Sequence, residues 1–273
     1  MSTSTAILKE AAQQQKAVRT RRPDLSMLLG VAVALAAMVA GIAVTGVKAA
    51  YFLQPTGALI VLGGTLGVII LTTPRAGLMN SARRVAELLW APDIDRRALM
   101  AEIMGYVRRA RAFGVLTLEP IAAQATTPFL RESLVITLDV QERDKLKSAL
   151  ELKLRLRERQ GETDAKVLEV SGGFAPTIGV LGTIVGLIDV LRQFSSLQSV
   201  ANGVGTAFVS TIYGLAVANL ILLPTANRIR ARVAEAFETH EMIIEGMMCI
   251  FDKMHPSLVQ ERLSFFLHES ESK

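Results

Sequence analysis

Four long apolar stretches constrain the fold of this chain more than any other feature. They cover residues 25–47, 56–73, 174–191 and 203–224, and Asp189 is the only charged residue inside them. At 1.5 Å per residue, a helix over the first stretch reaches roughly 34 Å and a helix over the second roughly 27 Å, enough to cross the hydrocarbon core of a bilayer. The sequence therefore predicts an all-α integral membrane protein with four transmembrane helices.

Charged residues make up 20% of the chain and gather between and outside these stretches, which divides the chain into membrane and soluble parts. We expect a cytoplasmic N-terminal tail, a first pair of transmembrane helices, a helical cytoplasmic domain, a second pair and a helical cytoplasmic C-terminal tail. The expected boundaries are 1–24, 25–73, 74–173, 174–224 and 225–273.

Capping and turn residues predict where the helices of the cytoplasmic domain begin and end. Asp95 is expected to cap a helix over 96–113, and Gly114 to terminate it. Two further short helices are expected to begin near Pro120 and Pro128, because proline is favoured in the first turn of a helix.

Helical periodicity also surrounds the second pair of transmembrane helices. A highly charged helix over 142–160 is expected to run toward the third apolar stretch, and the C-terminal tail is expected to be helical to about Phe251. The polar segment 195–202 is expected to be a link between the third and fourth transmembrane helices.

The positions of the basic residues predict the orientation in the membrane. Of the 30 lysines and arginines, only Lys48 lies in an expected outer loop, and Arg192 lies at the outer end of the third transmembrane helix. Because positive charge accumulates in cytoplasmic segments, we expect both termini in the cytoplasm and the helices in the bacterial inner membrane. This topology accounts for the net charge of +5 without nucleic-acid binding.

The sequence contains no recognisable catalytic or metal-binding pattern. Cys249 is the single cysteine, and the spacing of His240, His255 and His268 fits no common metal motif. The chain also lacks a phosphate-binding loop and a dinucleotide fingerprint. We therefore expect no enzymatic activity, no cofactor and no bound metal.

Small and hydroxyl residues distinguish the second pair of transmembrane helices. Gly179, Gly182 and Gly186 recur along one face of the third helix, Thr183 lies beside them, and Thr211 lies in the middle of the fourth helix. Each threonine hydroxyl either bonds the carbonyl of its own i−4 residue or contributes to an ion path.

Two prolines mark the inner ends of the same helices. Pro176 lies near the start of the third and Pro224 at the end of the fourth. Proline leaves a backbone carbonyl without its helical donor. Beside a cavity, such a carbonyl can coordinate a cation or mark strain.

No ionisable residue lies at the centre of an apolar stretch. Asp189 and Arg192 are three residues apart near the outer end of the third helix, where they are expected to pair. Ion transport usually requires an ionisable group at mid-membrane. If the chain conducts ions, a partner subunit therefore supplies the carboxylate, which predicts a hetero-oligomer.

Three segments of the chain resemble the A subunit of the bacterial flagellar stator. Two lie in the second helix pair, FAPTIGVLGTIVGLIDVL and STIYGLAVANLILLPTANRIR, and the third, RAFGVLTLE, lies in the central domain. That subunit, MotA or PomA, belongs to the MotA/TolQ/ExbB ion-channel superfamily. The resemblance spans most of the chain: two leading helices, a cytoplasmic domain, two core helices and a tail.

The resemblance implies a mechanism and roles for particular residues. A pentamer of A-type subunits surrounds two single-span MotB-like subunits, each with a membrane aspartate, and ion flow turns the ring against a FliG-like rotor switch protein. Pro176, Pro224 and Thr211 match the residues of the ion pathway. Arg111 and Glu119 match the charged pair that touches the rotor, although without the motif they would be ordinary surface charges.

The identity of the ion stays open at this point. Thr183 stands in the pattern GT-x-x-G, which the resemblance associates with sodium-driven A subunits, and a hydroxyl beside a partner carboxylate supplies one of the oxygens that sodium requires. The TolQ/ExbB branch has a threonine at the equivalent place and uses protons, so the same hydroxyl can order water instead.

Two alternatives compete with a flagellar stator. A TolQ/ExbB-like proton-channel subunit has three spans with one helix before the cytoplasmic loop, whereas two apolar stretches precede the loop here. A four-helix scaffold without ion flow would retain the glycine stripe but has no need of Thr183, Thr211 and two prolines near a pore.

Overall fold

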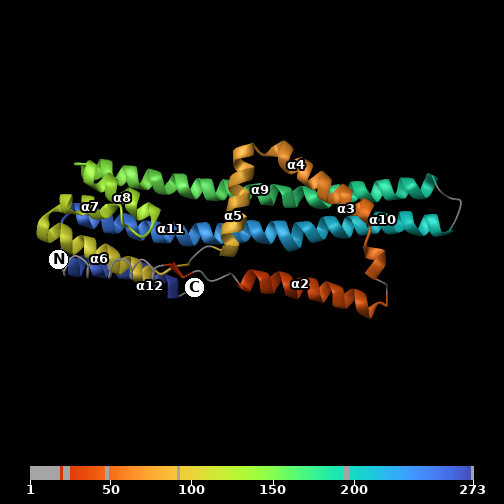
Figure 1. The fold of residues 1–273 in the computed structure, drawn as a ribbon, viewed down its shortest axis with the longest axis horizontal. Helices are drawn as coiled ribbons and strands as arrows, with labels where there is room; N and C mark the ends of the chain where they lie inside the picture. The colour runs from red at the N-terminus through yellow and green to blue at the C-terminus, as the bar shows by residue number, and fades with distance from the viewer. Residues whose placement is uncertain (1–18, 21–24, 47–48, 91–92, 193–196, 272–273) are drawn as a thin grey trace. The chain divides into compact units, whose positions relative to one another are not determined.

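The computed structural model describes residues 19–20, 25–46, 49–90, 93–192 and 197–271, which are almost wholly helical (Figure 1). The chain divides into two compact units. The span unit comprises Pro23–Leu89 and Gly161–Ala231, and the head unit comprises Met1–Arg22, Trp90–Gln160 and Arg232–Lys273. The expectation of a helical chain is confirmed. Within the described ranges, the only strands are β1 (Arg19–Thr20) and β2 (Asp93–Ile94), which pair antiparallel in the head unit.

The span unit contains the apolar helices. In chain order its elements are α2 (Leu25–Val44), the 3₁₀ turn η1 (Ala49–Phe52), α3 (Pro55–Ala58), the π-helical η2 (Leu59–Gly63), α4 (Gly64–Thr72), α5 (Arg75–Trp90), the second part of α9 (Arg143–Arg192), α10 (Leu197–Ala216), the π-helical η4 (Val217–Leu222) and the start of α11 (Leu223–Phe251).

Three helices among the described residues are long and apolar enough to cross a membrane: Pro55–Thr72, Arg143–Arg192 and Gly203–Phe251. The apolar helix Leu29–Val44, within α2, is shorter. Along α2 the side chains of Leu29 and Val44 are exposed, as expected for a helix that faces lipid rather than water.

Helix α9 joins two of the expected segments without a break. The charged helix predicted from about residue 142 does run into the third apolar stretch, as one helix that continues through Pro176. Helix α11 ends at Phe251, as predicted. The expected polar link is wrong where the structure describes it, because α10 begins at Leu197; residues 195 and 196 lie outside the described residues.

The head unit is a helical bundle around one apolar core. Its elements are α6 (Arg96–Phe113), the 3₁₀ turn η3 (Val115–Leu118), α7 (Glu119–Ala122), α8 (Pro128–Asp139), the first part of α9, the remainder of α11 and α12 (Pro256–Glu271). The largest side chains wholly buried in this core are Phe129, Leu99, Ile103, Leu118, Leu130, Leu134, Leu146, Leu150, Met242, Ile243 and Met247.

The predicted bounds of α6 are confirmed. The carboxylate of Asp95 accepts hydrogen bonds from the backbone N–H groups of Arg97 and Ala98 at 2.9 and 3.3 Å, which satisfies two donors that the helix leaves free. Gly114 ends the helix with a φ of 91°, a value that favours glycine. The short helices beginning near Pro120 and Pro128 are also present, as α7 and α8.

Candidate functional site

Thr183 of α9 and Thr211 of α10 face each other inside the span unit. Their Oγ1 atoms are 2.6 Å apart. The Thr183 hydroxyl also lies 3.0 Å from the carbonyl oxygen of Ala207 and 3.2 Å from that of Gly179. The structure therefore brings together the two threonines that the sequence singled out on separate helices.

The direction of the bond between the two hydroxyls follows from their neighbours. A threonine hydroxyl has one proton and two lone pairs. The carbonyls of Ala207 and Gly179 can only accept, so Thr183 donates to a carbonyl and accepts the proton of Thr211. Within the described residues, the lone pairs of Thr211 Oγ1 then have no donor. This oxygen is the one that could accept a hydrogen bond from water or coordinate a cation.

A seam of glycines allows α9 and α10 to approach closely enough for this contact. A Cβ atom added to Gly186 would lie 2.6 Å from the backbone nitrogen of Ala207, and one added to Gly179 would lie 3.0 Å from the carbonyl oxygen of Ser210. On the other helix, a Cβ on Gly214 would lie 2.6 Å from the carbonyl oxygen of Ala175. The glycine stripe predicted on the third helix is therefore the surface on which α10 packs (Figure 1).

The helix formed by α3, η2 and α4 packs on the same pair through its own glycines. A Cβ on Gly57 would meet the hydroxyl of Ser210 at 2.6 Å, and one on Gly64 would meet the side chain of Ile178 at 2.8 Å. Ser210 is wholly buried and donates to the carbonyl of Thr206 at 2.7 Å. Small residues thus let three helices approach around the threonine pair.

The two prolines lie at different places in this packing. Pro176 lies inside α9, with its Cα 3.2 Å from the position of a Cβ on Gly214. Pro224 is exposed and is the second residue of α11, which begins directly after the π-helical η4. Because its ring conflicts with the carbonyl of Leu220, the wider π turn before it has a physical cause.

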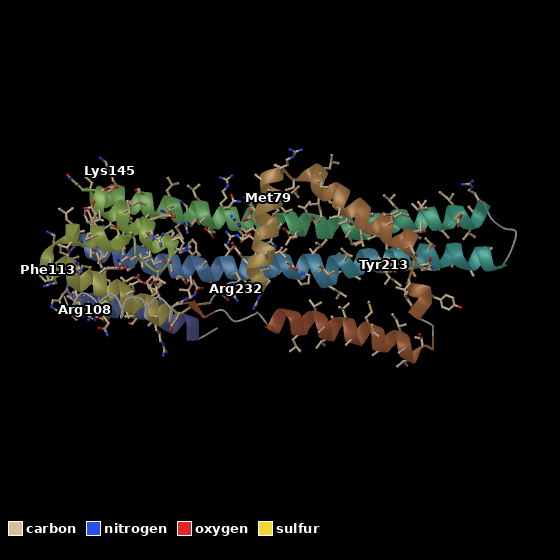
Figure 2. All side chains as sticks on the ribbon, in the orientation of Figure 1. Met79, Arg108, Phe113, Lys145, Tyr213 and Arg232 are labelled. Atoms are coloured by element: carbon tan, nitrogen blue, oxygen red, sulfur yellow. The ribbon has the colours of Figure 1, made fainter. Side chains whose placement is uncertain are left out.

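Two polar residues of the span unit, Tyr213 and Asn219, were not singled out from the sequence. Tyr213, on α10, donates its hydroxyl proton to the carbonyl of Phe52 and accepts the backbone N–H of Gln54 at 3.3 Å, where α3 begins beside α10 (Figure 2). Asn219 lies within η4, is exposed, and donates to the carbonyl of Leu215 at 3.0 Å. The only sequence signal for either residue is a polar side chain in an apolar stretch.

Charged residues tie α5 to α9 within the span unit. The hydroxyl of Ser81 donates to the carbonyl of Asp164 at 2.9 Å, and Arg84 donates to the Asp164 carboxylate at 3.2 Å. The side chain of Asp164 is almost wholly buried, so the contact with Arg84 offsets part of its desolvation. Asp189 and Arg192 are both exposed at the end of α9, and their pairing stays a prediction.

Arg111 and Glu119 flank the turn between α6 and α7 in the head unit. Arg111 lies in the last turn of α6 and Glu119 in the first turn of α7, and both are exposed. Each charge is at the helix end where the macrodipole favours it. Both are therefore placed where a partner protein could reach them.

A partly buried histidine lies against Phe129 in the head unit. The rings of His240 and Phe129 stack with their centroids 4.0 Å apart. Burial, reinforced by the charge of Arg157, lowers the pKa of His240 to about 4, although the carboxylate of Glu132 opposes the shift. His240 is therefore neutral at physiological pH.

Neither a metal-binding cluster nor a reactive cysteine is found among the described residues. They contain no group of three histidine, cysteine, aspartate or glutamate side chains that could hold a metal ion. Cys249 is buried, and burial raises the pKa of its thiol to about 11, which leaves it a poor nucleophile.

The chain is similar to proteins of bacterial motility along nearly its whole length. Residues 121–242 match the model of the MotA/TolQ/ExbB proton channel family. Motility protein A of Treponema pallidum is 27% identical over 244 residues, covering 89% of this chain and 94% of that protein. Motility protein A of Bacillus subtilis is 23% identical over 249 residues, covering 89% and 91%, and the chemotaxis protein PomA of Vibrio alginolyticus is 24% identical over 246 residues, covering 90% and 96%.

Solved structures have the same fold. The C. jejuni MotAB structure superposes with a TM-score of 0.82 at 21% identity, covering 89% of this chain and 95% of that chain. The flagellar MotAB stator complex of Bacillus subtilis superposes with a TM-score of 0.80 at 22% identity, covering 90% and 96%.

Proposed function

We propose that the chain is the ion-conducting A subunit of a bacterial flagellar stator, because residues 121–242 match the MotA/TolQ/ExbB proton channel family model and the chain is similar to motility proteins over most of its length. It couples proton or sodium flow across the inner membrane to torque on the rotor. The observation that carries the proposal is the contact between Thr183 and Thr211, a pair of hydroxyls held by a glycine seam between two apolar helices. A scaffold without ion flow needs the seam but not the hydroxyl pair.

Four helices cross the membrane in this proposal: α2, the continuous α3–η2–α4 helix, the second part of α9, and α10 with η4. The exposed apolar side chains of α2 and the basic residues of the tails support this topology. Both termini and the head unit then lie in the cytoplasm. The two helices before α5 favour the stator branch over a TolQ/ExbB-like subunit.

A single-span B subunit completes the channel. Within the apolar stretches of these helices, over residues 25–44, 56–72, 174–191 and 203–222, Asp189 is the only acidic residue, and it lies near one end of α9. The carboxylate that binds the ion therefore comes from the partner, and the uncommitted lone pairs of Thr211 face it. A pentamer of this chain around two such subunits, and torque through Arg111 and Glu119 on a FliG-like rotor protein, complete the proposal.

Reconstitution tests the proposal. The chain with its B subunit is expected to conduct ions in proteoliposomes, and the chain alone to conduct none. Thr211→Val keeps the shape of the side chain but removes the oxygen. If that oxygen contacts the ion, the loss of about 1.5–3 kcal/mol lowers the flux by roughly tenfold or more. Thr72→Val is the matched control, because its hydroxyl bonds only carbonyls of its own helix. Robust conduction by the chain alone, or equal flux in both variants, would refute the proposal.

The same vesicles identify the ion. We propose sodium, because the Thr211 hydroxyl, oriented by Thr183, and a partner carboxylate beside it supply oxygens of the kind that a hard cation requires. Flux driven by a sodium gradient at fixed pH is then expected to disappear in Thr183→Ala. Full flux without sodium, abolished by a protonophore, assigns protons instead and leaves the hydroxyls to order water.

A further inference from the structure

The turn between α6 and η3 exposes two large apolar side chains. Phe113 is 76% exposed and Leu116 is 74% exposed, more than any other large apolar side chain described in the head unit. Figure 2 shows Phe113 at the end of α6, with Arg108 on the same helix. Together, residues 111–119 form what we call the α6–η3 corner.

The corner is held rigidly, so this exposure is not the result of a loose turn. The N–H of Gly114 donates to the carbonyl of Ala110 at 2.9 Å, and the hydroxyl of Thr117 donates to the carbonyl of Gly114 at 2.6 Å. Leu118 is wholly buried and Val115 packs on the core. The backbone therefore inserts two apolar side chains into the core while it keeps Phe113 and Leu116 in solvent.

Positive charge without a partner lies next to this apolar pair. Arg108, Arg109 and Arg111 are exposed near the end of α6, and no ion pair or hydrogen bond joins their side chains to the residues that the structure describes. By contrast, Arg143 of the same unit pairs with Asp252 at 3.1 Å. Arginine and large apolar residues together are typical of the centre of protein interfaces.

We propose that Phe113 and Leu116 insert into an apolar pocket of the rotor protein, with acidic side chains on the side that faces the three arginines and a basic group on the side that faces Glu119. The identity of the partner rests on the proposed function. The charges on opposite sides of the corner fix the orientation of docking and speed the encounter, and the apolar pair carries most of the affinity. Glu119 disfavours an anionic lipid surface as the occupant.

The two contributions differ in their dependence on salt. Exposed charges are screened at high ionic strength, whereas burial of apolar surface is not weakened by it. Binding of the purified stator complex to the purified rotor switch protein of the same organism is measured at low and at high potassium chloride. Replacing both Phe113 and Leu116 with serine is expected to raise Kd by at least about tenfold at both salt concentrations. Arg111→Glu is expected to slow association at low salt and to have little effect at high salt.

A matched control exists on α12 of the same unit. Phe265 and Leu258 are 67% and 50% exposed, and replacing both with serine is expected to leave Kd unchanged. The inference is refuted if the double variant of Phe113 and Leu116 binds the rotor protein with the same Kd as the wild-type chain or the control variant. If the wild-type complex conducts ions and binds the rotor protein, that result overturns only the apolar contact. If the wild-type complex neither conducts nor binds, the proposed function fails as well.

Two other occupants of the corner have their own signatures. Brominated anionic lipid quenches the fluorescence of a tryptophan that enters a bilayer. If it quenches the Phe113→Trp variant more than the wild-type chain, whose tryptophan is Trp90, the corner lies in a bilayer. Cross-linking between two copies through Phe113→Cys would assign the surface to the oligomer. Either result overturns the inference.

Discussion

Gly186→Ala is expected to separate α9 from α10 and to disrupt the threonine pair. The added Cβ would lie 2.6 Å from the nitrogen of Ala207, 2.8 Å from the carbonyl oxygen of Gly203 and 2.9 Å from the Cα of Ala207. All three are backbone atoms, so no side chain can rotate away. Restoring an ordinary contact of 3.4 Å requires the helices to move apart by about 0.8 Å, the difference from 2.6 Å.

The site lies one turn away and moves with the helix. Adding about 0.8 Å to the 3.0 Å bond between Thr183 and Ala207 exceeds hydrogen-bonding distance. Overpacking of this kind costs about 1–3 kcal/mol, and the lost hydrogen bond about 1 kcal/mol more. Ion flux is therefore expected to fall together with the thermal stability of the purified complex.

Gly173→Ala, on the same helix, separates this steric effect from helix propensity. A Cβ on Gly173 would meet nothing within 4 Å, so this variant gains helix propensity without a clash. Denaturation temperatures of the two purified complexes, measured side by side, are expected to be lower for Gly186→Ala. Equal stability and equal flux in the two variants would show that the seam tolerates a methyl group, and the reasoning would be refuted.

Two further predictions concern the head unit. Burial and Arg157 hold the pKa of His240 at about 4, below its unfolded value of 6.5. The stability that the neutral ring contributes, up to ~3 kcal/mol, is therefore fully present above pH 6.5 and is lost as the pH falls toward 4. The thermal unfolding temperature is expected to depend much less on pH in His240→Phe, and an unchanged pH profile would contradict this role of His240. Asp95→Ala is expected to cost about 1 kcal/mol of stability through the lost helix cap, measured by denaturant unfolding, whereas Asp95→Asn retains an acceptor and most of the stability.

Local signals predicted the helix bounds well where a single residue determines them. Asp95 accepts backbone N–H groups and Gly114 adopts a positive φ, and both effects act within a few residues. The segments that form α5 and α12 were expected to be helical, but their separate bounds were not predicted, because their patterns lie inside longer charged segments. The π turn η4 could not be predicted from Pro224 alone, because the position at which the widened turn forms depends on the packing around the helix.

The sequence also suggested the surface for helix packing without identifying its partner. Periodicity places Gly179 and Gly186 on one face of the third apolar stretch. Four apolar helices offer several ways to bury such a face. The approach of Gly203 and Gly214 on α10 decides which one forms, and complementary small residues on two helices are a property of the pair rather than of either segment.

The hydrogen bonds of the site illustrate the same limit. Taken alone, each threonine is expected to donate to the carbonyl of its own i−4 residue, which is Gly179 for Thr183 and Ala207 for Thr211. In the structure the carbonyl of Ala207 accepts from Thr183 instead. The proton of Thr211 is thereby directed toward Thr183, and its lone pairs are left without a donor among the described residues. The register between α9 and α10, which no single helix encodes, therefore converts two helix-bonded hydroxyls into one oxygen that is available to an ion.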